Sequence, residues 1–312
     1  MPDNQPLVSV IMNCLNCVKY LREAIDSVYA QTYNNWEIIF WDNASTDNSA
    51  KIAKSYDEKL RYFKEEETIS LGAARNKALK QAKGEFIAFL DCDDIWMSEK
   101  LEKQIPLFKD PLVGLVYSEV INFNDNGKEY RPHSGKVMGR GDCFVSLLHK
   151  YFLSMPTVII RRSTLEQQNE WFDPQFELIE EYDLFIRIAY KWHLDMCPDV
   201  LAKYRVHLES SSWVKRDLFF NESLAALDKY AGLFPSFSTD YYDLLLKDIY
   251  ISKAHYLWIS KKGNQARKFL QPYMFKNQKA FYLYLVSFFS YKIIYKILNY
   301  FGLKIKPKEF FK

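Results

Sequence analysis

Three short segments rich in carboxylates carry residue types that suit phosphate and metal chemistry. They are residues 42–47, 91–94 and 180–183. In the second segment Asp91, Asp93 and Asp94 lie so close together that they repel one another unless a cation or a hydrogen-bond donor compensates them. Hard oxygen ligands in a loop suit Mg²⁺ or Mn²⁺ bound together with a diphosphate. The structural alternative is a capped turn before a helix that begins near Ser98.

The first segment directly follows an apolar run that ends at Trp41. A polar turn, with Asp47 as the N-cap of the next helix, explains part of it. This interpretation leaves Asp42 unexplained. At the end of a strand, the Asp42 carboxylate is suited to accept hydrogen bonds from a base imide or a ribose hydroxyl.

The third segment combines acids with helical spacing. Leu184 and Ile188 mark the helix, and acids are favoured in its first turn by the helix dipole. This structural explanation accounts for one or two of the acids. The functional interpretation is that Glu180, Glu181 or Asp183 acts as a general base at the mouth of a sheet.

Strands and helices alternate through the first half of the chain. Short apolar runs predict strands at 7–12, 36–41, 60–63, 86–90 and 113–117, and helical spacing occurs at 21–28, 47–53 and 73–82. This alternation implies an α/β fold with a mainly parallel sheet and flanking helices. In open sheets of this kind ligands bind beyond the carboxyl ends of the strands, where the acidic segments fall. The run 124–127, Asn-Asp-Asn-Gly, predicts a hairpin turn.

Taken together, these motifs resemble family 2 of the GT-A glycosyltransferases, a large family of inverting bacterial enzymes. The resemblance covers about residues 6–212 in order and spacing. Its motifs lie at 8–12 with Asn16, 31–33, 36–47, 72–76, 84–94, 180–184, and 204–207 followed by 210–212.

The resemblance implies the Rossmann-like GT-A fold and a set of donor-binding residues. Asp42 corresponds to the acid that reads the nucleobase, Arg75 to a basic residue near the nucleotide, and Asp91 to the ribose-side member of an Asp-x-Asp motif. Asn13, which begins the segment after the first strand, is placed with them. The family commonly has Pro-x-Tyr-Asn in this segment, so the aromatic platform for the base is missing at Leu15.

The resemblance also implies a metal site and a catalytic base. Asp93 corresponds to the direct ligand of Mn²⁺ or Mg²⁺, and His207 to a histidine that in some members joins the metal or the diphosphate. The alternative for His207 is a surface or hydrogen-bonded histidine. Glu181 stands where the family places its base, usually an Asp, and Glu has nearly the same intrinsic pKa with one more methylene. Glu180 and Asp183 remain alternatives for the base.

The expected activity is therefore metal-assisted transfer of a sugar, with inversion, from a nucleoside-diphosphate sugar to an acceptor hydroxyl. We expect a UDP-sugar as donor, a glycan or lipid-linked acceptor, and a role in assembling cell-surface polysaccharide, lipopolysaccharide or glycoprotein glycans. One alternative is a nucleotidyltransferase, which usually carries a Gly-rich, basic phosphate loop that residues 13–16 lack. The other is a catalytically dead carbohydrate- or partner-binding module, against which the intact Asp91 and Asp93 argue.

The domain organisation follows from a change of pattern near residue 215. Beyond this point the chain is helical and rich in Tyr, Phe, Leu and Lys. We expect a catalytic domain at 1–214, in which about 1–118 bind the nucleotide-sugar and about 119–214 bind the acceptor. Residues 215–312 are expected to form a helical C-terminal region.

Composition narrows the functional classes further. A net charge of +3 is too small to indicate nucleic-acid binding. Five scattered cysteines argue against a disulfide framework and favour a reducing cytoplasm. Cys14 and Cys17 alone make a poor zinc site, because two of four ligands are missing. The N-terminus has no basic region followed by an apolar core, so no signal peptide is expected.

The C-terminal tail has two interpretations. Residues 281–301 carry Phe, Tyr, Leu and Ile almost continuously, with lysines at 292, 296, 304, 306 and 308. The apolar run 281–291 is too short to span a bilayer. A helix within 281–312 either contacts the inner face of the cytoplasmic membrane as a peripheral element, near lipid-linked acceptors, or packs on the catalytic domain or a partner subunit.

Overall fold

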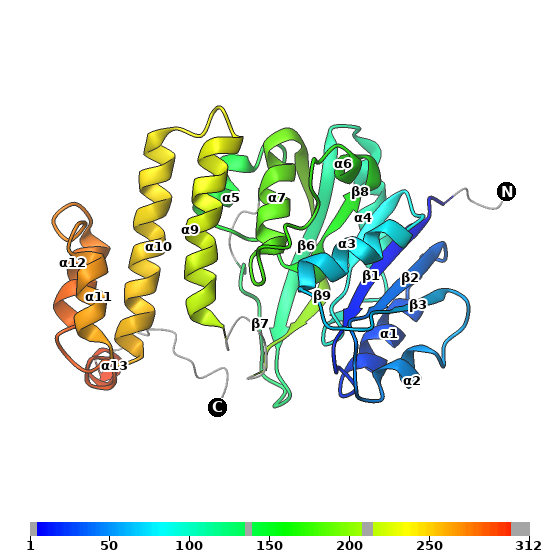
Figure 1. Ribbon diagram of the computed structural model, residues 1–312, viewed down its shortest axis with the longest axis horizontal. Coiled ribbons are helices and arrows are strands. Elements are labelled where there is room, and N and C mark those ends of the chain that lie inside the picture. Colours follow the sequence, from blue (N-terminus) through cyan, green and yellow to red (C-terminus); the bar gives the residue numbers. More distant parts are fainter. Residues whose placement is uncertain (1–4, 135–138, 208–214, 301–312) are drawn as a thin grey trace. The chain divides into compact units, whose positions relative to one another are not determined.

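The chain divides into two compact units in the computed structural model, which describes residues 5–134, 139–207 and 215–300. The units are Met1–Ser210 and Ser211–Lys312 (Figure 1). The serines at 210–212 and the lysines at 304, 306 and 308 lie outside the described residues.

Four parallel strands form one half of the sheet in the first unit. Their order is β3 (Leu60–Lys64), β2 (Trp36–Asp42), β1 (Val8–Cys14) and β4 (Phe86–Phe89). The helices that connect them are α1 (Leu21–Tyr29), α2 (Ser49–Ala53) and α3 (Leu71–Gln81). Alternate residues of β1 face the same side, and Val10 packs with Ile38 and Ile25 in one buried cluster. Burial on both faces explains why these strands are continuous apolar runs.

The other half of the sheet is mixed. It continues from β4 through β8 (Ile159–Arg161), β6 (Val113–Phe123), β9 (His193–Arg205) and β5 (Ile95–Trp96), and β7 (Glu129–Tyr130) pairs with β6. Strand β8 is antiparallel to both neighbours, whereas β6 and β9 are parallel. The predicted α/β class is confirmed; every pair of neighbours is parallel in the first half, whereas in the second half the parallel pair β6 and β9 is joined by antiparallel pairs. The predicted turn at 124–127 does join two antiparallel strands, with Gly127 at φ 74°.

The remaining helices of the first unit complete its core. They are α4 (Lys100–Gln104), the short 3₁₀ turns η1 (Ile105–Lys109) and η2 (Met155–Thr157), α5 (Phe144–His149), α6 (Arg162–Glu166) and α7 (Glu180–Lys191). The helix expected near Ser98 begins at Lys100. Helix α7 is amphipathic, buries Leu184, Phe185 and Ile188, and carries three acids in its first turn.

Among residues 215–300 the second unit contains helices and no strand. They are α9 (Arg216–Leu233), α10 (Thr239–Ile259), α11 (Gly263–Leu270), α12 (Gln278–Val286) and α13 (Tyr291–Tyr300). Ala254 and Trp258 of α10 pack with Leu270 in a small core of their own. At Gly263 a Cβ would collide with the backbone carbonyl of Ser287, so only glycine permits this approach. None of the described helices is both long and apolar enough to cross a bilayer.

Candidate active site

A buried arginine joins two of the acidic segments. Arg75, on α3, is 3% exposed, and its guanidinium donates to the Asp91 carboxylate at 2.9 Å and to the Glu180 carboxylate at 2.5 Å. Burial opposes the arginine's charge, but the carboxylates of Asp91, Glu180 and Glu181 outweigh this effect and raise its pKa. Segments about ninety residues apart, one after β4 and one opening α7, therefore meet at a single side chain.

Glu181 differs from the other acids in the first turn of α7. Glu180 is paired with Arg75, and Asp183 is paired with Arg187 at 2.9 Å. Within the described residues Glu181 has no ion pair, and it is half-buried. Burial raises the pKa of Glu181 to about 8; Arg75 opposes this rise, and the Glu180 and Asp91 charges add to it. A carboxyl with such a pKa can take up a proton near neutral pH.

Three tyrosines are near Glu181: Tyr182, the next residue in the chain, and Tyr151 and Tyr204, on which the Glu181 charge acts. Burial, with the Glu181 charge next in importance, raises the pKa of the Tyr151 phenol, and the Tyr151 ring lies 4.9 Å from the Tyr182 ring. Burial and the charges of Asp94 and Glu181 also raise the pKa of Tyr204, near the end of β9. The Tyr204 phenol therefore interacts electrostatically both with Glu181, the candidate base, and with the acidic segment at 91–94.

The second acidic segment pairs with His207, two residues beyond the end of β9. The Asp93 carboxylate lies 2.9 Å from Nε2 of His207. Arg205 supports this pair, since its Nε donates to the Asp93 carbonyl and its backbone N–H to the Asp94 carboxylate, both at 2.8 Å. Burial and the charges of Asp93 and Asp91 raise the pKa of Asp94 well above its usual value. Three strand ends, β4, β9 and β5, thereby meet around Asp93.

Asp42 lies at the end of β2 and is completely buried. One carboxylate oxygen accepts from the Tyr62 hydroxyl at 2.6 Å, and the other accepts from the Ser45 backbone N–H at 2.8 Å. Burial, with the Asp42 charge, raises the Tyr62 pKa. The carboxylate is therefore held in one orientation, with lone pairs remaining for a further donor.

The loop after Asp42 is unusually constrained. Ala44 has φ 65°, a conformation that is uncommon for a residue with a side chain. The Asn16 side chain holds the loop from the β1 side by accepting from the Thr46 N–H at 2.8 Å. The N-cap of α2 is Asn48 rather than Asp47, although Asp47 still accepts from the Ser49 N–H at 2.9 Å.

Asn13 lies beside this loop, near the end of β1, where it pairs in register with Trp41. Both polar atoms of its amide are buried, and they have no hydrogen-bond partner among the described residues. A buried amide without partners costs free energy, about 1–3 kcal/mol, unless a bound molecule supplies the missing bonds. Among the residues predicted to bind the sugar donor, Asn13 is therefore the one whose side chain would gain most from hydrogen bonds to a bound molecule.

Several contributors were not identified from the sequence. Tyr62 orients Asp42, and Arg205 holds the Asp93 segment. Arg205 lies inside a motif that we quoted, but no local pattern indicates that its side chain turns toward Asp93. Glu180 was considered only as a base, whereas its carboxylate is occupied by Arg75.

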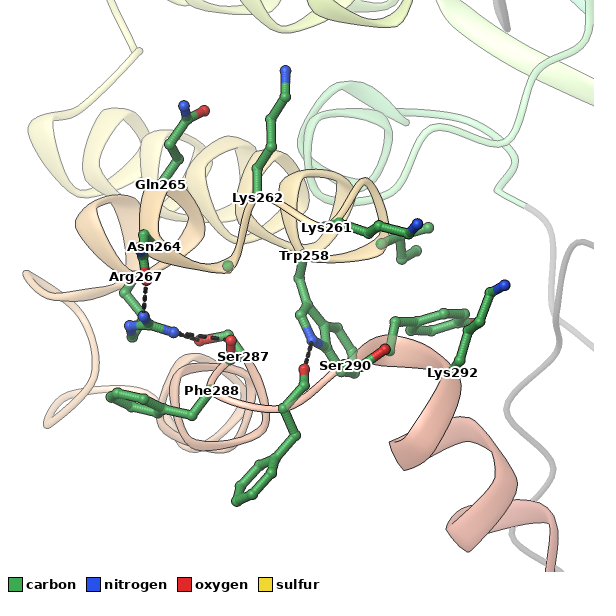
Figure 2. Close-up of a pocket in the computed structure, with 14 residues that line it drawn as sticks. Trp258, Lys261, Lys262, Asn264, Gln265, Arg267, Ser287, Phe288, Ser290 and Lys292 are labelled. Carbon is green, nitrogen blue, oxygen red and sulfur yellow. Dashed lines mark hydrogen bonds between the residues drawn. The ribbon is translucent and has the colours of Figure 1, made fainter.

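The second unit holds a separate cavity of about 840 Å³ (Figure 2). It lies between the α10–α11 turn and the α12–α13 turn, and four cations line it: Lys261, Lys262, Arg267 and Lys292. Arg267 lies 3.9 Å over the Phe288 ring and donates to the Ser287 carbonyl at 2.9 Å. The cavity therefore combines positive charge with aromatic surface.

Comparison with known proteins identifies the family. A family model described as Glycosyl transferase family 2 matches residues 9–172. The Escherichia coli protein named UDP-Glc:alpha-D-GlcNAc-diphosphoundecaprenol beta-1,3-glucosyltransferase WfgD is 34% identical over 212 residues, which span 66% of this chain and 79% of WfgD.

Solved structures match the fold. S. aureus TarS 1–349 superimposes with a TM-score of 0.62 at 21% identity, covering 78% of this chain and 70% of that chain, and has been solved with UDP and with UDP-GlcNAc. The mannosyltransferase PcManGT from Pyrobaculum calidifontis, in complex with GDP-Man and Mn²⁺, has a TM-score of 0.61 at 18% identity and covers 97% and 86% of the two chains. The fold is that of the GT-A enzymes, and the chain is a glycosyltransferase that belongs to family 2.

Proposed function

We propose that the chain transfers a sugar from a UDP-sugar to a hydroxyl of a glycan or lipid-linked acceptor, with inversion, in the assembly of cell-surface polysaccharide, lipopolysaccharide or glycoprotein glycans. The observation that carries the proposal is the convergence of the Arg75 network with the Asp93–His207 pair at one edge of the sheet. The printed names of two similar proteins support the reactants: WfgD for a UDP-glucose donor and a diphosphoundecaprenol-linked acceptor, and TarS for UDP-GlcNAc.

On the donor side, Asn13, Asp42 and Asp91 bind the nucleotide. The Asn13 amide offers a donor and an acceptor that lack partners, and a pyrimidine ring presents the complementary pair. Asp42, oriented by Tyr62, accepts the base imide. Arg75 acts through Asp91, because its guanidinium is already engaged by two carboxylates.

The Asp93 carboxylate and the His207 imidazole, 2.9 Å apart, would hold a Mn²⁺ or Mg²⁺ ion together with the diphosphate. The carboxylate oxygen is the ligand type that both ions prefer. When bound, such an ion neutralises charge on the leaving diphosphate. Arg205 keeps the Asp93 segment in place through its carbonyl.

Glu181 is the general base. It accepts the proton of the acceptor hydroxyl as that oxygen attacks the anomeric carbon from the face opposite the diphosphate, and a single displacement inverts the configuration. Glu180 and Asp183 are less suited, because each is engaged by an arginine. The raised pKa of Glu181 makes it a stronger base than an ordinary glutamate.

The domain roles follow from this assignment. Residues 1–214 carry the transfer reaction, with about 1–118 on the donor side and about 119–214 on the acceptor side, and 215–312 form the helical region. Strand β6 runs through residue 118 without a break, so the two halves share one sheet.

We propose that the helical region makes a peripheral contact with the inner face of the cytoplasmic membrane. Exposed apolar side chains gather on α12, α13 and the turn between them: Phe281, Tyr282, Leu285, Phe288, Phe289 and Ile293. The four cations of the neighbouring cavity suit anionic lipid headgroups (Figure 2).

Release of UDP provides the direct test. The purified chain with Mn²⁺, a panel of nucleoside-diphosphate sugars and a polyprenyl-diphosphate-linked sugar should release UDP only when donor and acceptor are both present. Asn13→Ala should raise the KM for the donor by about tenfold or more, the equivalent of one lost hydrogen bond or two. Asn34→Ala, at an exposed asparagine that precedes β2, is the matched control. If no UDP-sugar supported the reaction and another nucleoside-diphosphate sugar released its nucleotide instead, the assignment of a UDP-sugar as donor would be refuted.

A further inference from the structure

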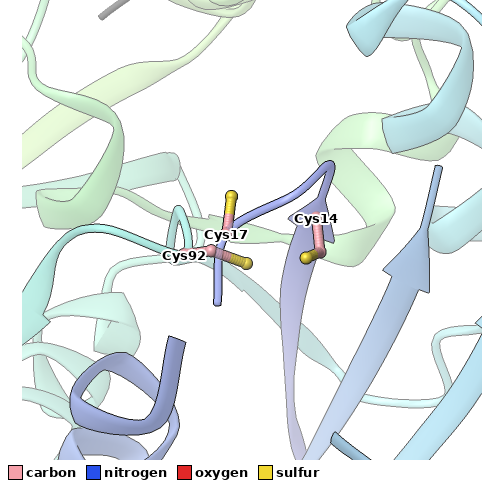
Figure 3. Close-up of side chains that lie close together, drawn as sticks. All are labelled: Cys14, Cys17 and Cys92. Atoms are coloured by element: carbon pink, nitrogen blue, oxygen red, sulfur yellow. The ribbon is translucent and has the colours of Figure 1, made fainter. Parts of the chain in front are cut away.

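Three cysteines from separate segments meet beside the candidate donor site (Figure 3). Cys14 ends β1, Cys17 lies in the loop before α1, and Cys92 lies between Asp91 and Asp93. Their Sγ atoms all lie within 4.8 Å of one another. The fold therefore supplies a third thiol to the Cys14–Cys17 pair, which the sequence alone left two ligands short of a zinc site.

The separation of the sulfurs suits one shared metal ion. A zinc–thiolate bond is about 2.3 Å long, so three sulfurs around one ion lie roughly 4 Å apart. The Sγ separations of at most 4.8 Å exceed this spacing by less than about 1 Å. All five cysteines are free, so no disulfide competes for these sulfurs.

The backbone that carries the thiols is already fixed. The Cys17 N–H donates to the Ser49 hydroxyl at 3.1 Å, and Cys14 belongs to the parallel ladder between β1 and β2. The Cys92 thiol contacts the Asn13 carbonyl at 3.1 Å. Because these segments do not have to be ordered on binding, little conformational entropy opposes capture of an ion.

Ligand chemistry separates this cluster from the Asp93–His207 pair. Thiolates are soft ligands and select Zn²⁺ or Cu⁺, whereas carboxylates suit Mg²⁺ and Mn²⁺. Among the described residues, the cysteines are the group of three or more potential ligands that lies close enough to hold an ion. Cys17 is half-buried and gives access from solvent, while Cys14 and Cys92 are buried.

We propose that Cys14, Cys17 and Cys92 bind one thiophilic divalent ion of the zinc class, independently of the Mn²⁺ or Mg²⁺ used in sugar transfer. Each thiol loses its proton to solvent as its sulfur binds the ion. The bound ion fastens the loop after β1 to the Asp91–Asp94 segment. This site does not depend on the proposed function, because its occupancy is read without any sugar substrate.

Cd²⁺, a spectroscopic substitute for Zn²⁺, tests the proposal on the reduced full-length chain. Titration should give thiolate-to-metal charge-transfer absorption that saturates at one ion per chain, and Zn²⁺ should displace it. Asp93→Ala should leave the absorption unchanged, which separates this site from the proposed catalytic metal. Cys143→Ser, at a buried cysteine outside the cluster, should also leave it unchanged.

Cys17→Ser is the informative variant, because Cys17 is the least buried of the three. We expect affinity to fall more than about a hundredfold, beyond the usual loss for an outer-shell partner. Selective alkylation of Cys17 in the folded, unmutated chain should abolish the absorption. Because the chain is already folded when Cys17 is modified, this loss does not come from a folding defect. Three results would each overturn the proposal. The first is that Cd²⁺ produces no thiolate absorption, and the second is that Cys17→Ser binds Cd²⁺ as tightly as the unmutated chain. The third is a Cys14–Cys17 disulfide whose reduction does not restore ion binding.

Discussion

The two units of the chain differ in what they bury and what they expose. The first unit buries charged side chains at strand ends and on helix α3, among them Asp42 at 0%, Asp94 at 1% and Arg75 at 3% exposure. The second unit exposes apolar rings, with Phe288 and Phe289 each at 59%. Burying charge costs free energy unless partners compensate it, and exposing clustered apolar surface is unusual for a surface without a partner.

Each unit therefore has a feature that does not favour its stability: buried charge in the first unit and exposed apolar surface in the second. In the first, Arg75 and Arg187 pair with the Glu180 and Asp183 carboxylates, and the Arg205 backbone N–H donates to the Asp94 carboxylate. In the second, a small core around Trp258 leaves rings at the surface for contact. We therefore expect substitutions in the first unit to change the rate of sugar transfer, and substitutions in the second unit to change binding to membranes.

The largest effect is expected from Asp93→Ala. Because this carboxylate is the proposed ligand for the ion that neutralises the leaving diphosphate, the rate of sugar transfer should fall by about a thousandfold or more. UDP release measured with and without added Mn²⁺ checks this, and the melting temperature should stay near that of the unmutated chain. Asp199→Ala, which removes an exposed carboxylate on β9, should keep full activity. Wild-type rates in Asp93→Ala would exclude the metal role.

Glu181→Gln should lower kcat by about a hundredfold to ten-thousandfold, because it removes the general base but keeps the side chain's size. The donor affinity, measured by calorimetry with UDP, should change little. Loss of donor affinity with an unchanged kcat would instead assign Glu181 to donor binding. Activity retained in Glu181→Gln but lost in Asp183→Asn would transfer the base role to Asp183.

Arg75→Met should destabilise the first unit by about 3–5 kcal/mol, because it leaves the Glu180 carboxylate buried without its cation. Denaturant unfolding followed by circular dichroism measures this loss. Lys103→Met breaks an exposed ion pair with Asp199 and should shift the transition little. A small effect of Arg75→Met would mean that solvent already reaches the network.

The pH profile gives a smaller but specific effect. Glu181 must be ionised to accept a proton, and its pKa is raised to about 8, so kcat/KM should rise with pH and level off above about 8. Between pH 6 and 8 the increase should exceed about tenfold. The residual activity of Glu181→Gln should not follow this curve. A profile that levels off near pH 5 would contradict the assignment.

The smallest effect is expected in the second unit. Changing Phe288 and Phe289 together to serine should weaken binding to vesicles with anionic lipids roughly threefold to tenfold, because less apolar area enters the interface. Cosedimentation measures this, and transfer to a water-soluble acceptor should not change. Phe219→Ser on α9 serves as the control for an exposed ring away from this turn. Equal vesicle binding by all three proteins would disprove the membrane role.

The parts predicted from the sequence are those with strong local signals. Strands β1, β2 and β4 are buried on both faces, and their apolar runs are visible without a structure, as are the acids at the ends of β2 and β4. Strands β8 and β5 are three and two residues long, too short for any periodicity, so the antiparallel pairs that they form were not predicted.

The same reasoning applies to the candidate site. Glu181 and Asp93 stand in recognisable motifs, so their positions follow from order and spacing. The contacts of Arg205 with the Asp93 carbonyl, and of Cys92 with the other two thiols, join residues more than seventy positions apart. Such pairings are set by the packing of the whole unit, and a single sequence carries no signal for them.

The Arg75 guanidinium has a consequence for substrate binding. Its two terminal nitrogens, fixed in one plane, hydrogen-bond to Asp91, proposed to lie on the donor side, and to Glu180, next to the proposed base, so a movement of one carboxylate strains the contact with the other. Under the proposal that Asp91 binds the nucleotide, we expect donor binding to be transmitted through this guanidinium to Glu180, next to Glu181, and to change the affinity for the acceptor.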